Sequence, residues 1–249
     1  MKPIVLVHGA WGGAWIWRRV LGPLRQAGRE VHALTLTGVG ERAHLRHADI
    51  GLSDHAADVV GLVRAEELDE VVLVGHSYGG MVITAAADRL LEQAQAQAVR
   101  EGGARAPLSR LVYLDAVVPM PGESWSSCHD PATVAARSAA AAAHDHALPP
   151  ADPAAFGLEG ADRAWLARRQ VPHPFGPYRE VLNFDAARLA TLPRTFIDCN
   201  EPAFPTIEAF RRRVREQAGW DLRVMATGHC PMVSRPQELV QMLLEMSEP

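Results

Sequence analysis

Residues 71–79 read VVLVGHSYG and carry the pattern that decides the fold. The apolar run 71–74 is typical of a buried strand, and residues 79–100 have helical character. Between them, GHSYG matches the G-x-S-x-G pattern, in which a serine lies on a tight turn from a strand into a helix. Such a turn projects the Ser77 hydroxyl above the carboxyl edge of a sheet. The sequence therefore predicts a serine nucleophile, and the alternative is a glycine-rich turn that only joins two elements.

The segments on either side of this turn alternate between strands and helices. Apolar runs typical of parallel strands buried on both faces occur at 4–7, 31–36, 71–74 and 111–114, with weaker ones at 195–198 and 222–225. Helical patterns cover 15–27, 52–65, 79–100, 206–218 and 236–246. This order predicts an α/β protein with a mostly parallel, doubly wound sheet.

Residues 119–185 interrupt the alternation. They contain many prolines, an alanine run and scattered aromatic residues but no clear strand. The segment is too long for a plain loop, and its aromatic residues argue against a disordered linker. We expect a helical cap at 119–185, inserted after the strand that ends near Asp115, with the core formed by 1–118 and 186–249.

The composition excludes several classes of protein. Of 249 residues, 48% are hydrophobic and 22% charged, and the net charge of −4 offers no basic field for nucleic acid or an anionic membrane. No apolar run reaches the roughly 18–20 residues of a membrane span, and the first run is too short for a signal peptide. The 3 cysteines form neither a disulfide framework nor a metal-binding pair, and no metal or cofactor is suggested. We expect a reduced, soluble, cytoplasmic protein with a small-molecule substrate, and a homodimer is left open.

A serine hydroxyl becomes an effective nucleophile only beside a base. His229 follows the last predicted strand and precedes the last predicted helix, and this position predicts it as the base. Among the other histidines, His8 and His76 are expected to support the site. His55 and His173 are expected at the surface or in the cap.

An oxyanion formed at the serine needs N–H donors. The residue after the nucleophile, Tyr78, is one expected donor. The glycine-rich loop 8–13, HGAWGG, supplies the second through Ala10, and it lacks the phosphate-binding patterns GxxxxGK[ST] and GxGxxG. Two aromatic residues of the predicted cap, Trp125 and Trp165, are expected to line an apolar substrate pocket with Trp11.

Several of these segments together resemble a known family. The sequence is similar to the hydroxynitrile lyase and plant methylesterase branch of the α/β-hydrolases, especially bacterial esterase-like members. The matching segments are 5–17 (VLVHGAWGGAWIW), 35–42 (TLTGVGER), 72–81 (VLVGHSYGGM), 111–116 (LVYLDA) and 192–196 (LPRTF). The resemblance implies the α/β-hydrolase fold, with Ser77 as nucleophile, His229 as base, and Ala10 and Tyr78 as oxyanion donors.

The chain departs from this family at three places. Cys230 follows His229 where hydroxynitrile lyases have a lysine, and Ala10 stands where they have a threonine, so ester hydrolysis is favoured over cyanohydrin cleavage. The slot of the catalytic aspartate falls on Pro202, which cannot orient an imidazole.

Three carboxylates are candidates to replace that aspartate. Asp115 ends a predicted strand, at a place where the related haloalkane dehalogenases carry an acid. Glu201 is the carboxylate nearest to the vacated slot, and Asp198 lies within a strand. The acid can come from different strands as long as it meets the imidazole correctly. Asp115 is favoured, while Glu201 and the absence of a functional acid stay open.

These features predict a serine hydrolase that cleaves a small or hydrophobic carboxylic ester or lactone through an acyl-enzyme on Ser77. The displaced aspartate motivates an alternative, a lyase- or cyclase-type enzyme that tailors natural products with His229 as its base. A non-catalytic ligand-binding module is the third reading, against which the intact serine turn, late histidine and oxyanion loop all argue.

Overall fold

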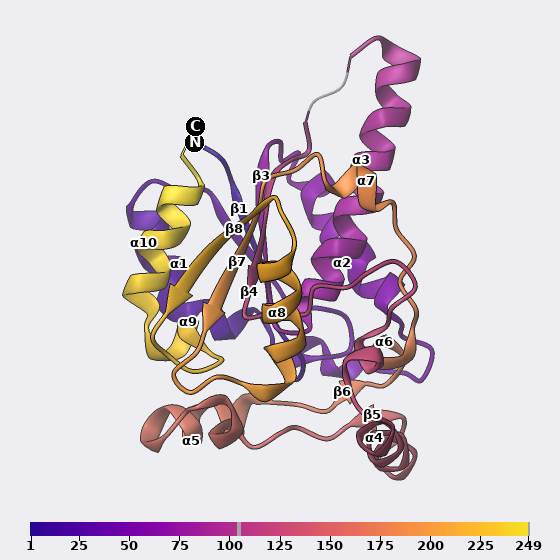
Figure 1. The fold of residues 1–249 in the computed structure, drawn as a ribbon, viewed down its shortest axis with the longest axis vertical. Coiled ribbons are helices and arrows are strands. Elements are labelled where there is room, and N and C mark those ends of the chain that lie inside the picture. The colour runs from indigo at the N-terminus through magenta and orange to yellow at the C-terminus, as the bar shows by residue number, and fades with distance from the viewer. Residues whose placement is uncertain (104–105, 249) are drawn as a thin grey trace.

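The computed structural model describes residues 1–103 and 106–248, and its centre is a parallel sheet of six strands (Figure 1). The strand order is β2-β1-β3-β4-β7-β8. The bounds are β1 (Ile4–Val7), β2 (Val31–Leu34), β3 (Val71–His76), β4 (Leu108–Leu114), β7 (Arg194–Cys199) and β8 (Trp220–Met225). All neighbouring strands pair in parallel, so their carboxyl ends meet at one edge.

Helices cover both faces of the sheet, which is why β1 and β3 are buried along their whole length. On one face lie α1 (Arg18–Gln26), α9 (Pro231–Ser234) and α10 (Pro236–Met246). On the other lie α2 (Leu52–Ala65), α3 (Gly79–Glu101) and α8 (Glu208–Glu216). The apolar cores on the two faces hold the sheet rigidly, and the loops at its carboxyl edge project from that frame.

The chain between β4 and β7 forms short elements, several of which lie beyond the carboxyl edge of the sheet in Figure 1. They are the 3-10 segment Trp125–Cys128, α4 (Pro131–Ala143), β5 (Ala147–Leu148), the 3-10 segment Pro153–Phe156, α5 (Gly160–Arg169), β6 (His173–Pro174), α6 (Gly176–Arg179) and α7 (Ala186–Leu189). The expectation of no strand in this region is wrong, because β5 and β6 pair antiparallel. Each is only two residues long, too short to show a sequence period.

Most predicted elements are present, with differences at their ends. The bounds of β1, α2 and α10 are those predicted. The strand predicted at 31–36 ends at Leu34, because the Leu36 N–H donates to His8 Nε2 at 3.1 Å instead of to a neighbouring strand. Predicted helices 15–27 and 206–218 each open with a 3-10 segment, Ala14–Trp17 and Pro205–Ile207. None of the described helices combines the length and apolar character needed to cross a bilayer.

Candidate active site

Ser77 lies on the turn between β3 and α3. Its φ of +56° is in the left-handed region, which a residue other than glycine seldom adopts and which often marks a functional position. The turn is tight, because a Cβ on Gly75 would lie 2.5 Å from the Gly79 carbonyl oxygen. The Ser77 carbonyl accepts hydrogen bonds from the N–H groups of Gly80 (3.1 Å) and Val117 (3.0 Å). This turn presents the Ser77 hydroxyl at the carboxyl edge of the sheet.

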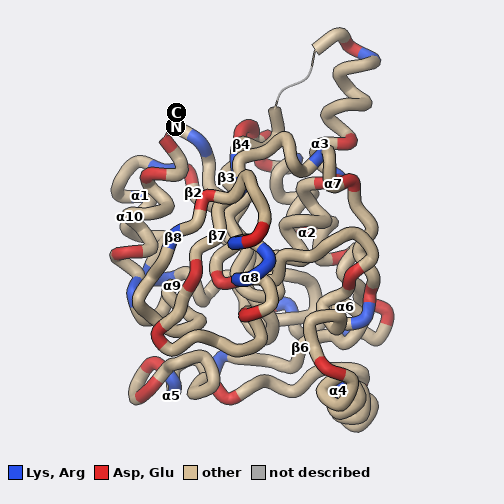
Figure 2. The backbone as a smooth tube through the Cα atoms, viewed as in Figure 1, with Lys and Arg blue, Asp and Glu red and all other residues tan. Residues whose placement is uncertain are grey.

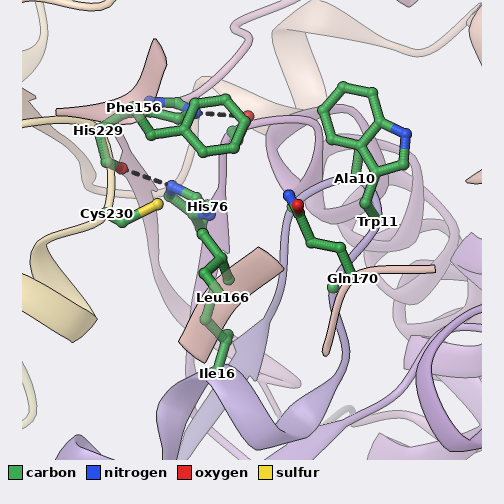
Figure 3. Close-up of a pocket in the computed structure, with 12 residues that line it drawn as sticks. Ala10, Trp11, Ile16, His76, Phe156, Leu166, Gln170, His229 and Cys230 are labelled. Carbon is green, nitrogen blue, oxygen red and sulfur yellow. Dashed lines mark hydrogen bonds between the residues drawn. The ribbon is translucent and has the colours of Figure 1, made fainter. Parts of the chain in front are cut away.

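His229 lies between β8 and α9, and its ring reaches Ser77. Nε2 is 2.9 Å from Ser77 Oγ. The loop is held from two sides: the His229 N–H donates to the Phe156 carbonyl at 3.0 Å, and the His229 carbonyl accepts from His76 Nε2 at 2.7 Å. The imidazole packs against the rings of Phe204 and Phe156, and Figure 3 shows Phe156 beside it. These contacts fix the ring with one nitrogen toward the serine.

The second ring nitrogen of His229 meets Asp115. Asp115 Oδ2 lies 2.6 Å from His229 Nδ1, and the Asp115 side chain is fully buried at the end of β4. Because an ionised carboxylate only accepts hydrogen bonds, Nδ1 carries the proton and Nε2 is free to accept one from the serine hydroxyl. Among the described residues, a hydrogen-bonded chain therefore joins Ser77, His229 and Asp115.

The other two candidate acids lie elsewhere. Asp198 is buried in β7 with its carboxylate bound by Arg211 and Arg215, each at 2.6 Å. Glu201 is exposed, and its N–H donates to the Thr227 carbonyl at 3.0 Å. Of the carboxylates weighed from the sequence, Asp115 is the one whose oxygen contacts the imidazole.

The loop 8–13 lies against the serine turn. A Cβ on Gly9 would stand 2.9 Å from Ser77 Cβ and 3.0 Å from His76 Nδ1, so this close approach requires glycine. Among the described hydrogen bonds, the N–H groups of Ala10 and Tyr78 have no protein acceptor. Free N–H donors beside a nucleophile are the arrangement that stabilises an oxyanion.

A cavity of about 20 Å³ adjoins Ser77, which is roughly the room one water needs. Figure 3 shows His229, His76, Phe156 and Cys230 on one side of it and Ala10, Trp11 and Gln170 on the other, with Leu166 and Ile16 between them. Apart from Ser77 and the two histidines, the lining is mainly apolar, and Gln170 is its further polar residue.

The expectation that three tryptophans line this cavity needs correction. Trp11 does line it. Trp125 lies behind Trp11, with ring centroids 6.2 Å apart, and is buried against Tyr78. Trp165 packs edge-on against Trp15 and borders a different surface hollow, because α5 turns that side chain away from the serine.

Several buried histidines around the site are held neutral. Burial lowers the pKa of His8 to about 4, and burial together with the neighbouring His229 lowers the pKa of His76 well below 6.5. His8 donates from Nδ1 to the Gly9 carbonyl at 2.7 Å and accepts the Leu36 N–H at Nε2, which fixes the start of the loop 8–13.

Two histidines expected at the surface or in the cap are buried beside Tyr78. His55 lies in α2, with Nδ1 2.9 Å from the Tyr78 hydroxyl and Nε2 2.9 Å from the Thr37 carbonyl. His173 is in β6 and packs on the ring of Tyr78. The surface expectation for His55 is therefore wrong, since the polar neighbours of its ring allow its burial. Within the described part of the chain, no group of three potential metal ligands converges.

Sequence reasoning missed Arg211, whose guanidinium contacts Asp115 Oδ1 at 2.6 Å. A signal was present: Ile207, Phe210 and Val214 form the buried stripe of the α8 region, and position 211 belongs to the same stripe. A charged residue at a core position needs a buried partner of opposite charge.

A strained serine between strand and helix, hydrogen-bonded through a late histidine to a buried aspartate, defines the class of α/β serine hydrolases. The chain belongs to the alpha/beta hydrolase family, whose model matches residues 4–242. The fold expected from the sequence is confirmed by this match, and the family branch is confirmed because the relatives below include a plant esterase of that branch.

A curated relative from Nocardioides sp. (strain SG-4G), a carbendazim hydrolyzing esterase, is 36% identical and the match covers 98% of each chain. Polyneuridine aldehyde esterase of Rauvolfia serpentina is 26% identical over 99% of this chain and 96% of its own. Among solved structures, an extracellular alpha/beta-hydrolase from a Paenibacillus species superposes with a TM-score of 0.83 at 18% identity, over the whole of both chains. The solved structure shows the fold, and the family match with the 36% identical esterase confirms the predicted enzyme class, a carboxylic ester hydrolase.

Proposed function

We propose that this protein hydrolyses a small-molecule carboxylic ester through an acyl-enzyme on Ser77. The observation that carries the proposal is the hydrogen-bonded chain from Ser77 Oγ to His229 (2.9 Å) and on to Asp115 (2.6 Å). Both distances are within the range that proton transfer requires.

In the first half of the reaction, Ser77 Oγ attacks the ester carbonyl while His229 Nε2 takes its proton. Asp115 then faces a positively charged imidazolium and stabilises it. The negative oxygen of the tetrahedral intermediate is bound by the N–H groups of Ala10 and Tyr78. When the intermediate collapses, His229 gives the proton to the departing alcohol, and the acyl group stays on Ser77.

In the second half, water replaces the alcohol. His229 takes a proton from this water as it attacks the acyl-enzyme, and the same two N–H groups bind the new oxyanion. Collapse releases the acid and returns the proton to Ser77 Oγ. The small cavity and its apolar lining favour a compact or hydrophobic group at the reacting carbonyl.

The alternative functions lose their support. A lyase or cyclase was motivated by the missing aspartate at Pro202, but Asp115 supplies an acid at hydrogen-bonding distance from the histidine. The names of the relatives also favour hydrolysis over elimination. A non-catalytic binding module would need neither the strained serine nor a polarised histidine.

The organisation around the site also belongs to this proposal. We assign residues 119–185 as a cap over a core formed by 1–118 and 186–249. Phe156 and Gln170 of that segment line the cavity, which supports a role in substrate selection. A cytoplasmic location and a homodimer stay predictions from the sequence.

The test is covalent labelling with a fluorophosphonate, together with turnover of p-nitrophenyl acetate. We expect the probe to label Ser77, and Ser77→Ala to lose both labelling and turnover. Ser138→Ala is a matched control, because this serine lies on α4 and bonds only within its helix. Labelling or turnover that persists in Ser77→Ala would overturn the proposal.

A further inference from the structure

Arg211 is a buried arginine next to the acid of the site. It lies on α8, a helix that carries basic and acidic residues (Figure 2), and its side chain is only 2% exposed. Nη2 donates to Asp115 Oδ1 at 2.6 Å, and Nε donates to Asp198 Oδ1 at 2.6 Å. One guanidinium therefore joins the acid that faces His229 to a second buried carboxylate.

Opposite charges are paired throughout this cluster. Asp115 and Asp198 contribute two negative charges and Arg211 and Arg215 two positive ones, while the largely exposed Glu208 lies 3.5 Å from Arg211 Nη1. A carboxylate without solvent is costly to keep ionised unless a cation or several N–H groups meet it. A guanidinium stays charged in proteins, so Arg211 is a permanent cation facing Asp115.

Arg211 also determines how the Asp115 carboxylate is turned. Oδ1 receives Arg211 Nη2, with the Cys199 N–H at 3.5 Å, whereas Oδ2 faces His229 Nδ1. Because Oδ1 is held, the carboxylate is fixed about its last torsion and Oδ2 points at the imidazole. A carboxylate held only by His229 would be free to rotate.

The same guanidinium binds the loop in which the sequence lacks its expected acid. Arg211 donates to the Cys199 carbonyl at 3.0 Å and to the Phe204 carbonyl at 2.9 Å, and these two residues flank Pro202. The ring of Phe204 in turn packs 4.4 Å from the ring of His229. Arg211 thus positions both Asp115 and Phe204, the residue whose ring packs on the imidazole of His229.

We propose that Arg211 is a positioning residue that keeps the Asp115 carboxylate aimed at His229, so that an acid at the end of β4 serves where the loop after β7 has Pro202 in the slot of the aspartate. The inference rests on the proposed function, because it assumes that Asp115 acts through His229. The competing explanation is that Arg211 only joins α8 to β7 through Asp198.

The test compares Arg211→Met with variants that separate these explanations, using kcat, KM and the pH profile of p-nitrophenyl ester hydrolysis. For Arg211→Met we expect kcat to fall roughly 10- to 100-fold with KM changed less than about 3-fold, because the imidazole loses its orientation. We also expect the acid limb of the kcat/KM profile to move up by about half a pH unit or more. Removing a cation beside Asp115 leaves its negative charge less compensated and stabilises the imidazolium.

A shift of the acid limb could also arise from the other groups that face His229. They are His76 from β3, Ser77 on the turn after it, Asp115 just after β4 and Cys230 on its own loop, with the rings of Phe156 and Phe204 packed on the imidazole. His76 and Cys230 stay neutral, because burial lowers the pKa of the first and raises that of the second. Arg211→Met alters none of these groups directly.

Two other variants at this cluster decide between the explanations. Asp198→Asn breaks the pair with Arg211 but keeps the contact to Asp115, so we expect kcat within about 3-fold of wild type. Arg211→Lys keeps the charge but cannot form all the bonds of the guanidinium fork, so we expect the wild-type acid limb with kcat about 10-fold lower. If Arg211→Met does not fold, the comparison of kcat between Arg211→Lys and Asp198→Asn decides instead.

Arg213→Met is the matched control. It lies on the same helix and forms a similarly short pair, with Glu123 at 2.7 Å, but its bonds go to Glu123 and Val118. We expect its kcat and pH profile to be those of wild type.

Equal losses in Asp198→Asn and Arg211→Met, with an unmoved acid limb, would show a purely structural role and overturn the inference. Wild-type kcat in Arg211→Met or Arg211→Lys would also overturn it. Asp115→Asn is measured in parallel. If it is inactive while Arg211→Met has wild-type activity, the inference on Arg211 is wrong and the proposed function stands. Retained turnover in Asp115→Asn would overturn the triad, and the role of Arg211 with it.

Discussion

The two sides of the Ser77–His229 pair are held by different kinds of interaction. On the acid side, Asp115 is fixed by a buried guanidinium that belongs to the core. On the oxyanion side, Trp11 is fixed by neutral hydrogen bonds to residues 148–173. Its indole Nε1 donates to the Leu148 carbonyl at 3.0 Å, and its carbonyl accepts the Val171 N–H at 3.1 Å.

This difference predicts how strongly a substitution disturbs each half of the site. A charge-assisted hydrogen bond is roughly twice as strong as a neutral one, and truncating one partner of a buried ion pair leaves the other charge uncompensated. Neutral bonds each contribute about 1 kcal/mol net, so the oxyanion side depends on several small contacts. We therefore expect one substitution on the acid side to remove most of the activity, whereas one substitution on the oxyanion side lowers it only in part.

The largest expected effect breaks the acid side. Asp115→Asn keeps the shape of the side chain but removes the charge that stabilises the imidazolium and selects its tautomer. We expect kcat for p-nitrophenyl acetate to fall by about 10⁴-fold, as for loss of the acid in other serine triads. Glu201→Gln is the matched control, because Glu201 is exposed and near the vacated slot. A comparable loss in Glu201→Gln, with turnover kept in Asp115→Asn, would show that Glu201 and not Asp115 is the acid of the site.

The sequence predicts those elements and site residues whose signal lies in residues that are neighbours along the chain. The strands of the core were predictable because burial on both faces makes them continuous apolar runs, as in β1 and β3. Ser77 and His229 follow from the serine turn and from chain order. The segment 119–185 had no such signal, since its strands are two residues long and their pairing spans α5.

The choice of acid depends on contacts between distant residues. Asp115 and His229 are 114 positions apart, and only the strand order brings them together. The sequence therefore favoured Asp115 without excluding Glu201. Arg211 stands in a run of arginines, RRRVR at 211–215, and only its helical spacing from Ile207, Phe210 and Val214 marks it as the one that turns inward.

The second prediction concerns pH and the oxyanion side. The pKa of His8 is about 4 in the folded protein and about 6.5 when unfolded, so between these values the unfolded chain binds a proton that the folded chain does not. Stability therefore falls as the pH falls from 6.5 towards 4. From pH 7 to 5, His8 accounts for a loss of about 2 kcal/mol.

Urea unfolding of wild type and His8→Gln at pH 7 and 5 measures this contribution. We expect the variant to lose less stability than wild type between the two pH values, although it is less stable at pH 7. The control is His47→Gln, because His47 is exposed and its replacement should leave the pH dependence unchanged. An identical pH dependence in wild type and His8→Gln would show that His8 is not held neutral by the fold.

The smallest expected effect loosens the oxyanion side from the segment that holds it. Trp11→Phe keeps an aromatic ring but loses the hydrogen bond to the Leu148 carbonyl, at a cost of about 1 kcal/mol in stability. Because Trp11 follows Ala10 directly and has a φ of +62°, a shift of this residue turns the Ala10 N–H away from the oxyanion. We expect kcat to fall about 10-fold with KM nearly constant, since this N–H acts in the transition state. Trp165→Phe is the control, and its packing on Trp15 outside the cavity predicts wild-type kcat and KM. A normal kcat in Trp11→Phe would mean that the loop 8–13 keeps its shape without the bond to Leu148, held by His8, by the Val171 N–H and by the fit of Gly9 against Ser77.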